Sequence, residues 1–320
     1  MSHYTTLIVV NQAEDASHAE RQAEEMLAPF DENTSVEPHR EYETGGPHEF
    51  WANDILIKDG FLDEGSVTWP AILQGLRAKY GPYDGEISRY GIDDLGMYRI
   101  TTYNPKSQWD WYALGGRWSG FFMIKAAVDA QARLGEVSWT RKDDPPEVGT
   151  ADLVQKRDID FEIMRRESEI KAEERWRSWT DLLSHLTEQE RADYLPWSLV
   201  RDNHGLDDIE TARKVYGEQA LVKLLRKREW ADRLGWDVSP VEDFYFDEPD
   251  AHERFIRANV DRTAVPWAVL DSEGWHEKGR MGWFGMSDDK YRQEDWNRMV
   301  QEMYDGLDDE AWLLLYDLHI

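Results

Sequence analysis

The chain has 320 residues, of which 41% are hydrophobic and 12% aromatic, which is enough apolar material for one large folded domain or two ordinary ones. It contains no cysteine, and this excludes disulfides, thiol catalysis and cysteine-ligated zinc. The formal net charge of −28 argues against direct binding of duplex DNA, because a field of that sign repels phosphates unless a local basic surface overrides it.

The apolar runs of the chain bear on its cellular localisation. The longest of them, at residues 7–10 and 312–316, are too short to span a bilayer. The first residues do not combine a basic region with an apolar run, so we expect no signal peptide. Together with the absence of cysteine, these features predict a cytoplasmic protein without a membrane partner.

The first half of the chain alternates between strand and helix patterns. Apolar, β-branched or capped stretches predict a strand at 4–10, a helix ending near Pro29, a helix at 66–81, and strands at 97–105 and 117–125. The two glycines at 115–116 then fall in the connection between the last two strands, where loops often carry binding chemistry.

The second half divides into a helical block and a closing α+β segment. Charged residues around two prolines at 141–149 predict a linker, and helical spacing follows over 157–186 and 206–235. A strand at 265–271, a helix at 288–307 and an apolar terminal strand complete the chain.

These elements predict an α+β fold in which a mixed or antiparallel sheet is packed by helices. We expect the terminal strand to lie centrally in the sheet, close to the first strand, which brings the two termini together. The predicted α+β core domain comprises 1–145 and 262–320, and 150–261 forms a helical insertion or subdomain.

The stretch "WDWYALGGRW" is the first candidate site. Glycines let a ligand approach backbone amides, Arg is a bidentate donor for phosphate, and indoles stack on rings. A nucleotide is therefore a candidate ligand, and the candidate binding residues are Trp109, Asp110, Trp111, Gly115, Gly116, Arg117 and Trp118. The alternative is a tight turn in which Arg117 pairs with Asp110 and the tryptophans pack in the core.

The end of the chain provides a second candidate. Asp317 and His319 are two apart in a predicted strand, so they share a face. Such a pair can bind a divalent metal or perform general acid–base catalysis, and His276, Glu277 or Asp110 would be further ligands. The alternative is an ordinary hydrogen bond between a terminal histidine and its neighbouring acid.

Two charge clusters have both a functional and a structural interpretation. Asp158, Asp160 and Glu162 could hold Mg²⁺, although acids at a helix start also serve as caps. A basic cluster could contact nucleic acid or an acidic partner, although helices carry basic residues near their C-termini for dipole reasons. That cluster consists of Lys223, Arg226, Lys227 and Arg228. Phosphate loops, dinucleotide fingerprints and zinc-protease or serine-hydrolase motifs are absent from the sequence.

Three stretches together resemble a family of uncharacterised bacterial and phage proteins. They are NPxxxWDWYxxGGRWSG, WxEKGxMGW and a C-terminal DxHI, and they cover roughly 90–165 and 262–320. The resemblance implies an accessory role that interferes with host machinery or host defence, in the host cytoplasm if the chain is phage-encoded. It implies no mechanism. Leu318 stands where similar sequences often have cysteine, which argues against a thiol role there.

Three functional hypotheses follow. The leading one is a phage-type accessory protein that recognises a nucleotide or other phosphorylated ligand at Arg117. If Asp317 and His319 bind a metal or act as acid and base, the protein would hydrolyse phosphate esters or phosphodiesters. The second is an acidic nucleic-acid mimic that inhibits a basic host protein. The third is a phage structural or assembly protein.

Overall fold

The computed structural model describes residues 2–125, 131–139, 146–205, 208–236, 238–282 and 286–320. The chain divides into two compact units. Met1–Met26 and Tyr112–Ile320 form unit 1, and Leu27–Trp111 form unit 2.

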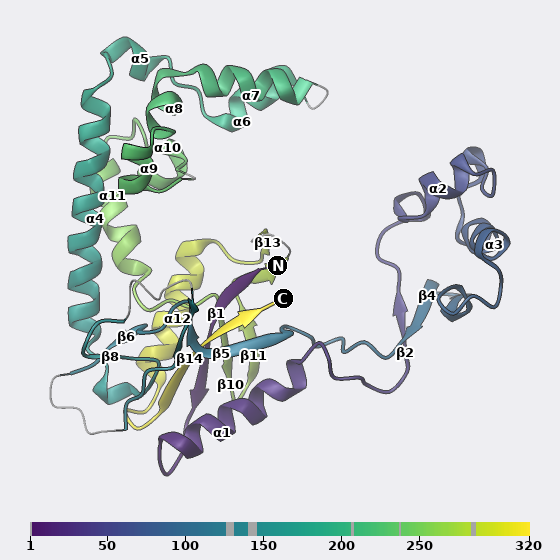
Figure 1. The fold of residues 1–320 in the computed structure, drawn as a ribbon, viewed down its shortest axis with the longest axis horizontal. Helices are drawn as coiled ribbons and strands as arrows, with labels where there is room; N and C mark the ends of the chain where they lie inside the picture. The colour runs from purple at the N-terminus through teal and green to yellow at the C-terminus, as the bar shows by residue number, and fades with distance from the viewer. Residues whose placement is uncertain (1, 126–130, 140–145, 206–207, 237, 283–285) are drawn as a thin grey trace. The chain divides into compact units, whose positions relative to one another are not determined.

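The strands and helices of the described residues are labelled as in Figure 1. The strands are β1 (His3–Val10), β2 (His39–Tyr42), β3 (Tyr90–Asp93), β4 (Gly96–Thr101), β5 (Trp111–Gly116), β6 (Phe122–Met123), β7 (Glu136–Val137), β8 (Thr150–Ala151), β9 (Leu153–Gln155), β10 (Ala268–Asp271), β11 (Gly274–Glu277), β12 (Gly279–Met281), β13 (Ser287–Asp289) and β14 (Trp312–His319). The helices are α1 (Ala16–Leu27), α2 (Asn53–Lys58), α3 (Trp69–Tyr80), α4 (Phe161–Ser184), α5 (Glu188–Ala192), α6 (Trp197–His204), α7 (Ile209–Glu218), α8 (Ala220–Leu225), α9 (Arg228–Leu234), α10 (Pro240–Phe244), α11 (Ala251–Asp261) and α12 (Gln293–Gly306).

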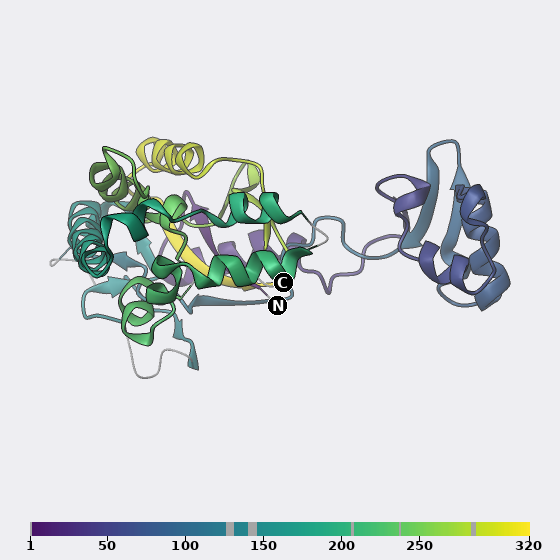
Figure 2. The ribbon, with the colours of Figure 1, turned by 90° about the horizontal axis from the view of Figure 1, so that it is seen from above.

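The main sheet of unit 1 has the order β11-β10-β1-β14-β5-β7, with β9 also paired to β14. β1 runs antiparallel to β14 and parallel to β10, so the sheet is mixed and the α+β prediction is confirmed. The two strands nearest the termini lie side by side in the middle of this sheet, as expected. Figure 2 shows the N- and C-termini next to each other, and Ser2 and Ile320 exchange two backbone hydrogen bonds of 3.0 Å.

Strand alternation distributes the sheet residues over two faces. Leu313 and Leu315 of β14 belong to a buried core that also contains Trp296 of α12. Tyr316 points to the other face, where burial, followed by the charge of Glu20 in α1, raises the pKa of its hydroxyl. Both faces of the central strands are therefore covered, which explains why β14 reads as a nearly continuous apolar run.

The helices from α4 to α11 build a second core within unit 1. Trp179 of α4 stacks on Phe244, and Phe244 stacks on Phe255 of α11, with ring centroids 4.5 and 4.9 Å apart. These aromatic rings are almost completely buried. The helices lie in the range expected for the helical subdomain, and Pro145 of the expected linker lies outside the described residues.

Unit 2 contains the three-stranded sheet β2-β4-β3 together with α2 and α3. Its own core includes Leu56, Ile72, Leu76 and Met97. The sequence predicts this segment within the α+β core domain, whereas it forms a compact unit of its own. Its sequence is richer in turn residues than the rest of the chain, because it holds 6 of the 12 prolines and 9 of the 22 glycines.

One strand differs from the expectation. The segment expected to connect two strands forms β5, and the glycine pair at 115–116 ends this strand. The following strand shrinks to β6, Phe122–Met123, because residues 117–121 make a turn. Within the described part of the chain, no helix has the length and apolar character needed to cross a membrane.

Candidate functional site

The end of β5 is built on two buried carboxylates. Gly115 and Gly116 adopt positive φ angles of 75° and 55°, which only glycine adopts readily. A Cβ atom at Gly115 would lie 2.4 Å from Asp152 Oδ2, and one at Gly116 would lie 2.4 Å from Asp317 Cβ. The glycine pair is therefore required by both its backbone conformation and the close approach of these side chains.

Asp317 connects the turn after β5 to the two terminal strands. Its Oδ2 accepts a hydrogen bond from Arg117 N (2.9 Å), and its Oδ1 lies 2.7 Å from His3 Nδ1. The side chain is 1% exposed. Asp317 thus brings the glycine turn, the end of the terminal strand and His3 together.

Asp152, which follows β8, organises the rest of the turn. Its Oδ1 accepts hydrogen bonds from Gly120 N (2.8 Å) and Phe121 N (3.0 Å), and its Oδ2 accepts from Ser119 Oγ and Gly135 N (both 2.9 Å). Complete burial raises the pKa of its carboxyl, against the lowering effect of these four hydrogen bonds. Asp152 is therefore a structural anion that the turn wraps around.

This arrangement corrects the expected role of the glycine turn. The amides of Arg117, Gly120 and Phe121 bind carboxylates of the protein itself, and those of Trp118 and Ser119 bind the carbonyls of residues 115 and 116. Because the protein already satisfies these donors, they do not form a phosphate cradle. Any anionic ligand must be held by side chains.

His3, Asp317 and His319 form a cluster where β1 begins and β14 ends. His3 and His319 are register partners, and their rings meet edge to face with centroids 4.8 Å apart. The cluster places Asp317 and His319 together as predicted, but Asp317 is oriented toward His3 and Arg117. Within the described part of the chain, no group of three or more His, Asp or Glu side chains is suited to hold a metal ion.

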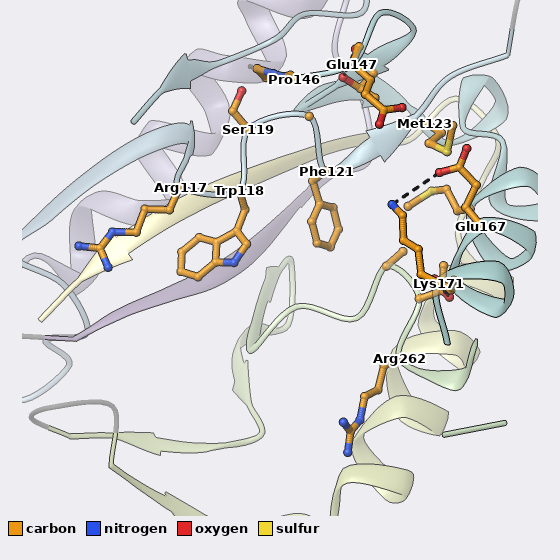
Figure 3. A pocket seen from close by; sticks show the side chains of 16 residues that line it. Arg117, Trp118, Ser119, Phe121, Met123, Pro146, Glu147, Glu167, Lys171 and Arg262 are labelled. Carbon is orange, nitrogen blue, oxygen red and sulfur yellow. Dashed lines mark hydrogen bonds and ion pairs between the residues drawn. The ribbon is translucent and has the colours of Figure 1, made fainter. Parts of the chain in front are cut away.

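A cavity of about 480 Å³ lies on the other side of the turn. Its wall combines the turn residues 117–121 with Thr150, the face of α4 that carries Glu167, Ser168 and Lys171, and the segment 262–264. Trp118 and Phe121 project from the turn toward this space (Figure 3). Turn, helix and segment come from distant parts of the sequence, so the cavity depends on the tertiary fold.

Three cationic residues, Arg117, Lys171 and Arg262, contribute to the lining of this cavity. Lys171 Nζ lies 3.8 Å from Glu167 Oε2 in an exposed pair. Arg117 and Arg262 are exposed, and neither guanidinium has a hydrogen bond or ion pair within the described part of the chain. Figure 3 shows the side chains of Arg117 and Arg262 extending away from Phe121 and Lys171.

The other residues of the first candidate site belong to unit 2. Trp109 is buried there, and its Nε1 donates to Leu27 O (3.2 Å), so it packs in a core. Asp110 and Trp111 are exposed residues of the same unit. All three thus lie in a different unit from the residues that line the cavity.

His276 lies outside the cavity as well. It is on β11, and its Nε2 lies 3.3 Å from Asp271 Oδ1. The last tryptophan of the WxEKGxMGW stretch, Trp283, lies outside the described residues.

The acidic and basic clusters have structural roles or surface positions. Asp160 caps α4, because its Oδ1 accepts from Ile163 N (3.0 Å), which matches the capping interpretation. Glu162 is an exposed residue of the first turn of that helix. The basic residues at the junction of α8 and α9, from Lys223 to Arg228, are exposed, and Arg228 pairs with Asp232.

Sequence reasoning missed His3, Asp152, Lys171 and Arg262. His3 precedes an apolar strand that pairs with the terminal strand, so strand pairing was the signal that could have found it. No local pattern distinguishes Asp152, Lys171 or Arg262 from other charged residues.

Comparison of the chain with family models, curated proteins and solved structures found no match. The resemblance to phage and bacterial proteins thus stays a prediction.

Proposed function

We propose that the protein is a phage-type accessory protein that binds a nucleotide or another phosphorylated ligand in the cavity beside turn 117–121. The observation that carries the proposal is the gathering of Arg117, Lys171 and Arg262 around one cavity in a chain with a net charge of −28. In such a chain, unpaired guanidinium groups at a cavity rim are the natural partners of an external anion.

The remaining wall combines groups that suit such a ligand with two carboxylates, Glu147 and Glu167, of which Glu167 pairs with Lys171. Hydroxyl groups of Thr150 and Ser168 lie on the wall, and Trp118 and Phe121 supply aromatic surface. Phosphate oxygens accept hydrogen bonds from guanidinium, ammonium and hydroxyl donors, and aromatic rings stack on bases. A volume of about 480 Å³ lies within the usual range of small-molecule sites.

The proposal is for binding. Both oxygens of Asp317 already have partners inside the protein, so Asp317 is not proposed as a catalytic acid, base or metal ligand. If the chain is phage-encoded, binding takes place in the host cytoplasm, and removal of a nucleotide signal from solution would counter a host defence.

The test is calorimetric titration with pyrophosphate, mononucleotides and cyclic dinucleotides. We expect at least one of these probes to bind, and to bind more weakly as salt concentration rises. Arg117→Ala and Arg262→Ala should each weaken binding about tenfold, as expected for the loss of a charge-assisted hydrogen bond of roughly 1.5 kcal/mol.

Arg228→Ala is the matched control, because Arg228 is exposed and far along the chain from the cavity segments. It should leave both binding and melting temperature unchanged. Failure of every probe to bind, or equal losses in all three variants, would overturn the proposal. The acidic-inhibitor hypothesis predicts instead a basic protein partner whose binding is steeply salt-dependent and indifferent to Arg117→Ala.

A further inference from the structure

A second, smaller cavity lies between α12 and the β10–β11 hairpin. Its volume is about 150 Å³, and Val269, Trp296, Met299, Val300 and Met303 provide its apolar wall. The strand register explains the hairpin side of the wall, because Val269 pairs with His276 and alternation places Asp271 on the same face.

The helix side follows from helical spacing. Met299 and Met303 are four residues apart on α12, so they are neighbours on one face. Met299 is 37% exposed, so its side chain is accessible to a partner at the cavity. Methionine side chains are flexible and polarisable, and they are common at surfaces that accommodate a partner. Trp296 gives this wall a rigid base, because its Nε1 donates to Pro266 O (2.8 Å).

The polar residues that line the cavity are Asp271, Glu273 and His276, and His276 Nε2 lies 3.3 Å from Asp271 Oδ1. Asp271 Oδ1 accepts hydrogen bonds from Glu273 N (2.8 Å) and Gly274 N (3.2 Å), which fixes this carboxylate in the hairpin turn. The Glu273 side chain is exposed and has no hydrogen bond or ion pair within the described part of the chain. The exposed carboxylate of Glu273 therefore lies at the entrance of a small cavity with an apolar wall.

We propose that this cavity receives a lysine side chain of a partner polypeptide. A lysine has a four-carbon apolar stem that ends in a compact ammonium group, so the stem would contact the methionines and the ammonium would pair with Glu273. The net charge of −28 favours approach of a basic partner over an acidic one. This inference is independent of the phosphate proposal, because the two cavities share no wall residue.

The test uses short blocked peptides and the methyl NMR signals of Met299 and Met303. The peptides are acetyl-Ala-Lys-Ala-amide, its norleucine analogue, which keeps the stem without the charge, and its glutamate analogue. We expect saturable shifts of both methyl signals with the lysine peptide, weaker shifts with norleucine and none with glutamate. Met299→Leu and Met303→Leu assign the two signals.

Glu273→Gln should weaken lysine binding about threefold, the size of one exposed ion pair, and leave norleucine binding unchanged. Glu294→Gln is the matched control, because Glu294 is an exposed acid on α12 that does not line the cavity. Equal effects of the two variants would overturn the assignment of Glu273. Absence of any methyl shift with the lysine peptide, or stronger shifts with glutamate, would overturn the proposal itself.

Discussion

Two buried carboxylates determine the conformation of the candidate site at the level of single residues. Asp152 and Asp317 together accept hydrogen bonds from the backbone of Arg117, Gly120, Phe121 and Gly135. In an acidic chain, these anions take the place that a bound phosphate would occupy in a glycine-rich turn. The turn is therefore preformed without a ligand.

Gly116→Ala tests the close approach of the turn to Asp317. The new Cβ would collide with the Asp317 side chain, and the positive φ adds strain, so we expect a loss of about 2–4 kcal/mol in unfolding free energy. Gly149→Ala is the control, because Gly149 has a φ of 89° and open space where a Cβ atom would stand. Measured by urea unfolding, the control should lose about 1 kcal/mol of unfolding free energy. Equal losses in Gly116→Ala and Gly149→Ala would contradict a specific collision with Asp317.

Asp152→Asn tests the burial of the second carboxylate. Since burial raises its folded-state pKa, the folded protein holds this proton more tightly than the unfolded chain does. The contribution of this proton to the unfolding free energy is fully present below the ordinary carboxyl pKa of 3.8. It is lost as pH rises through the raised pKa of the folded protein. The unfolding free energy of the wild type relative to Asp152→Asn should therefore fall as pH rises above 3.8.

Urea unfolding at several pH values measures this difference. Asp305→Asn, at an exposed site on α12, is the reference for a surface carboxylate and should show much less pH dependence. If the unfolding free energy of the wild type relative to Asp152→Asn instead rose with pH, the four hydrogen bonds would lower the pKa of Asp152 more than burial raises it.

At the level of secondary-structure elements, local sequence signals were reliable where burial is strong. β1 and β14 were predicted because their apolar, β-branched or aromatic residues are covered on both faces. β5, with the sequence WYALGG, was missed because its glycine pair resembles a turn, and its strand character comes from pairing with β14.

Asp160→Ala tests the capping interpretation at the start of α4. Loss of the hydrogen bond to Ile163 N should lower the unfolding free energy by about 1 kcal/mol. Asp158→Ala is the control, because that side chain caps no helix, and we expect a change within about 0.5 kcal/mol. If Mg²⁺ stabilised the wild type but neither variant, a metal site would replace this interpretation.

At the level of the whole molecule, the sequence predicted the fold class but not the division into units. The chain leaves unit 1 after Met26 and returns at Tyr112, and the high Gly and Pro content of the segment between them was not interpreted as a separate unit. The candidate site shows the same limit, because His3 and Asp317 are 314 residues apart and meet only through strand pairing. Arg117 was found because a glycine pair precedes it, whereas Lys171 and Arg262 are ordinary surface cations until the fold brings them to one cavity.

The most direct test of the phosphate-binding proposal is a crystal structure of the protein soaked with tungstate, an electron-dense phosphate analogue. The proposal predicts anomalous density in the cavity, in contact with Lys171 or Arg262 and weaker in crystals of Arg262→Ala soaked at the same tungstate concentration. Density only at the exposed basic cluster between Lys223 and Arg228, with an empty cavity, would contradict it.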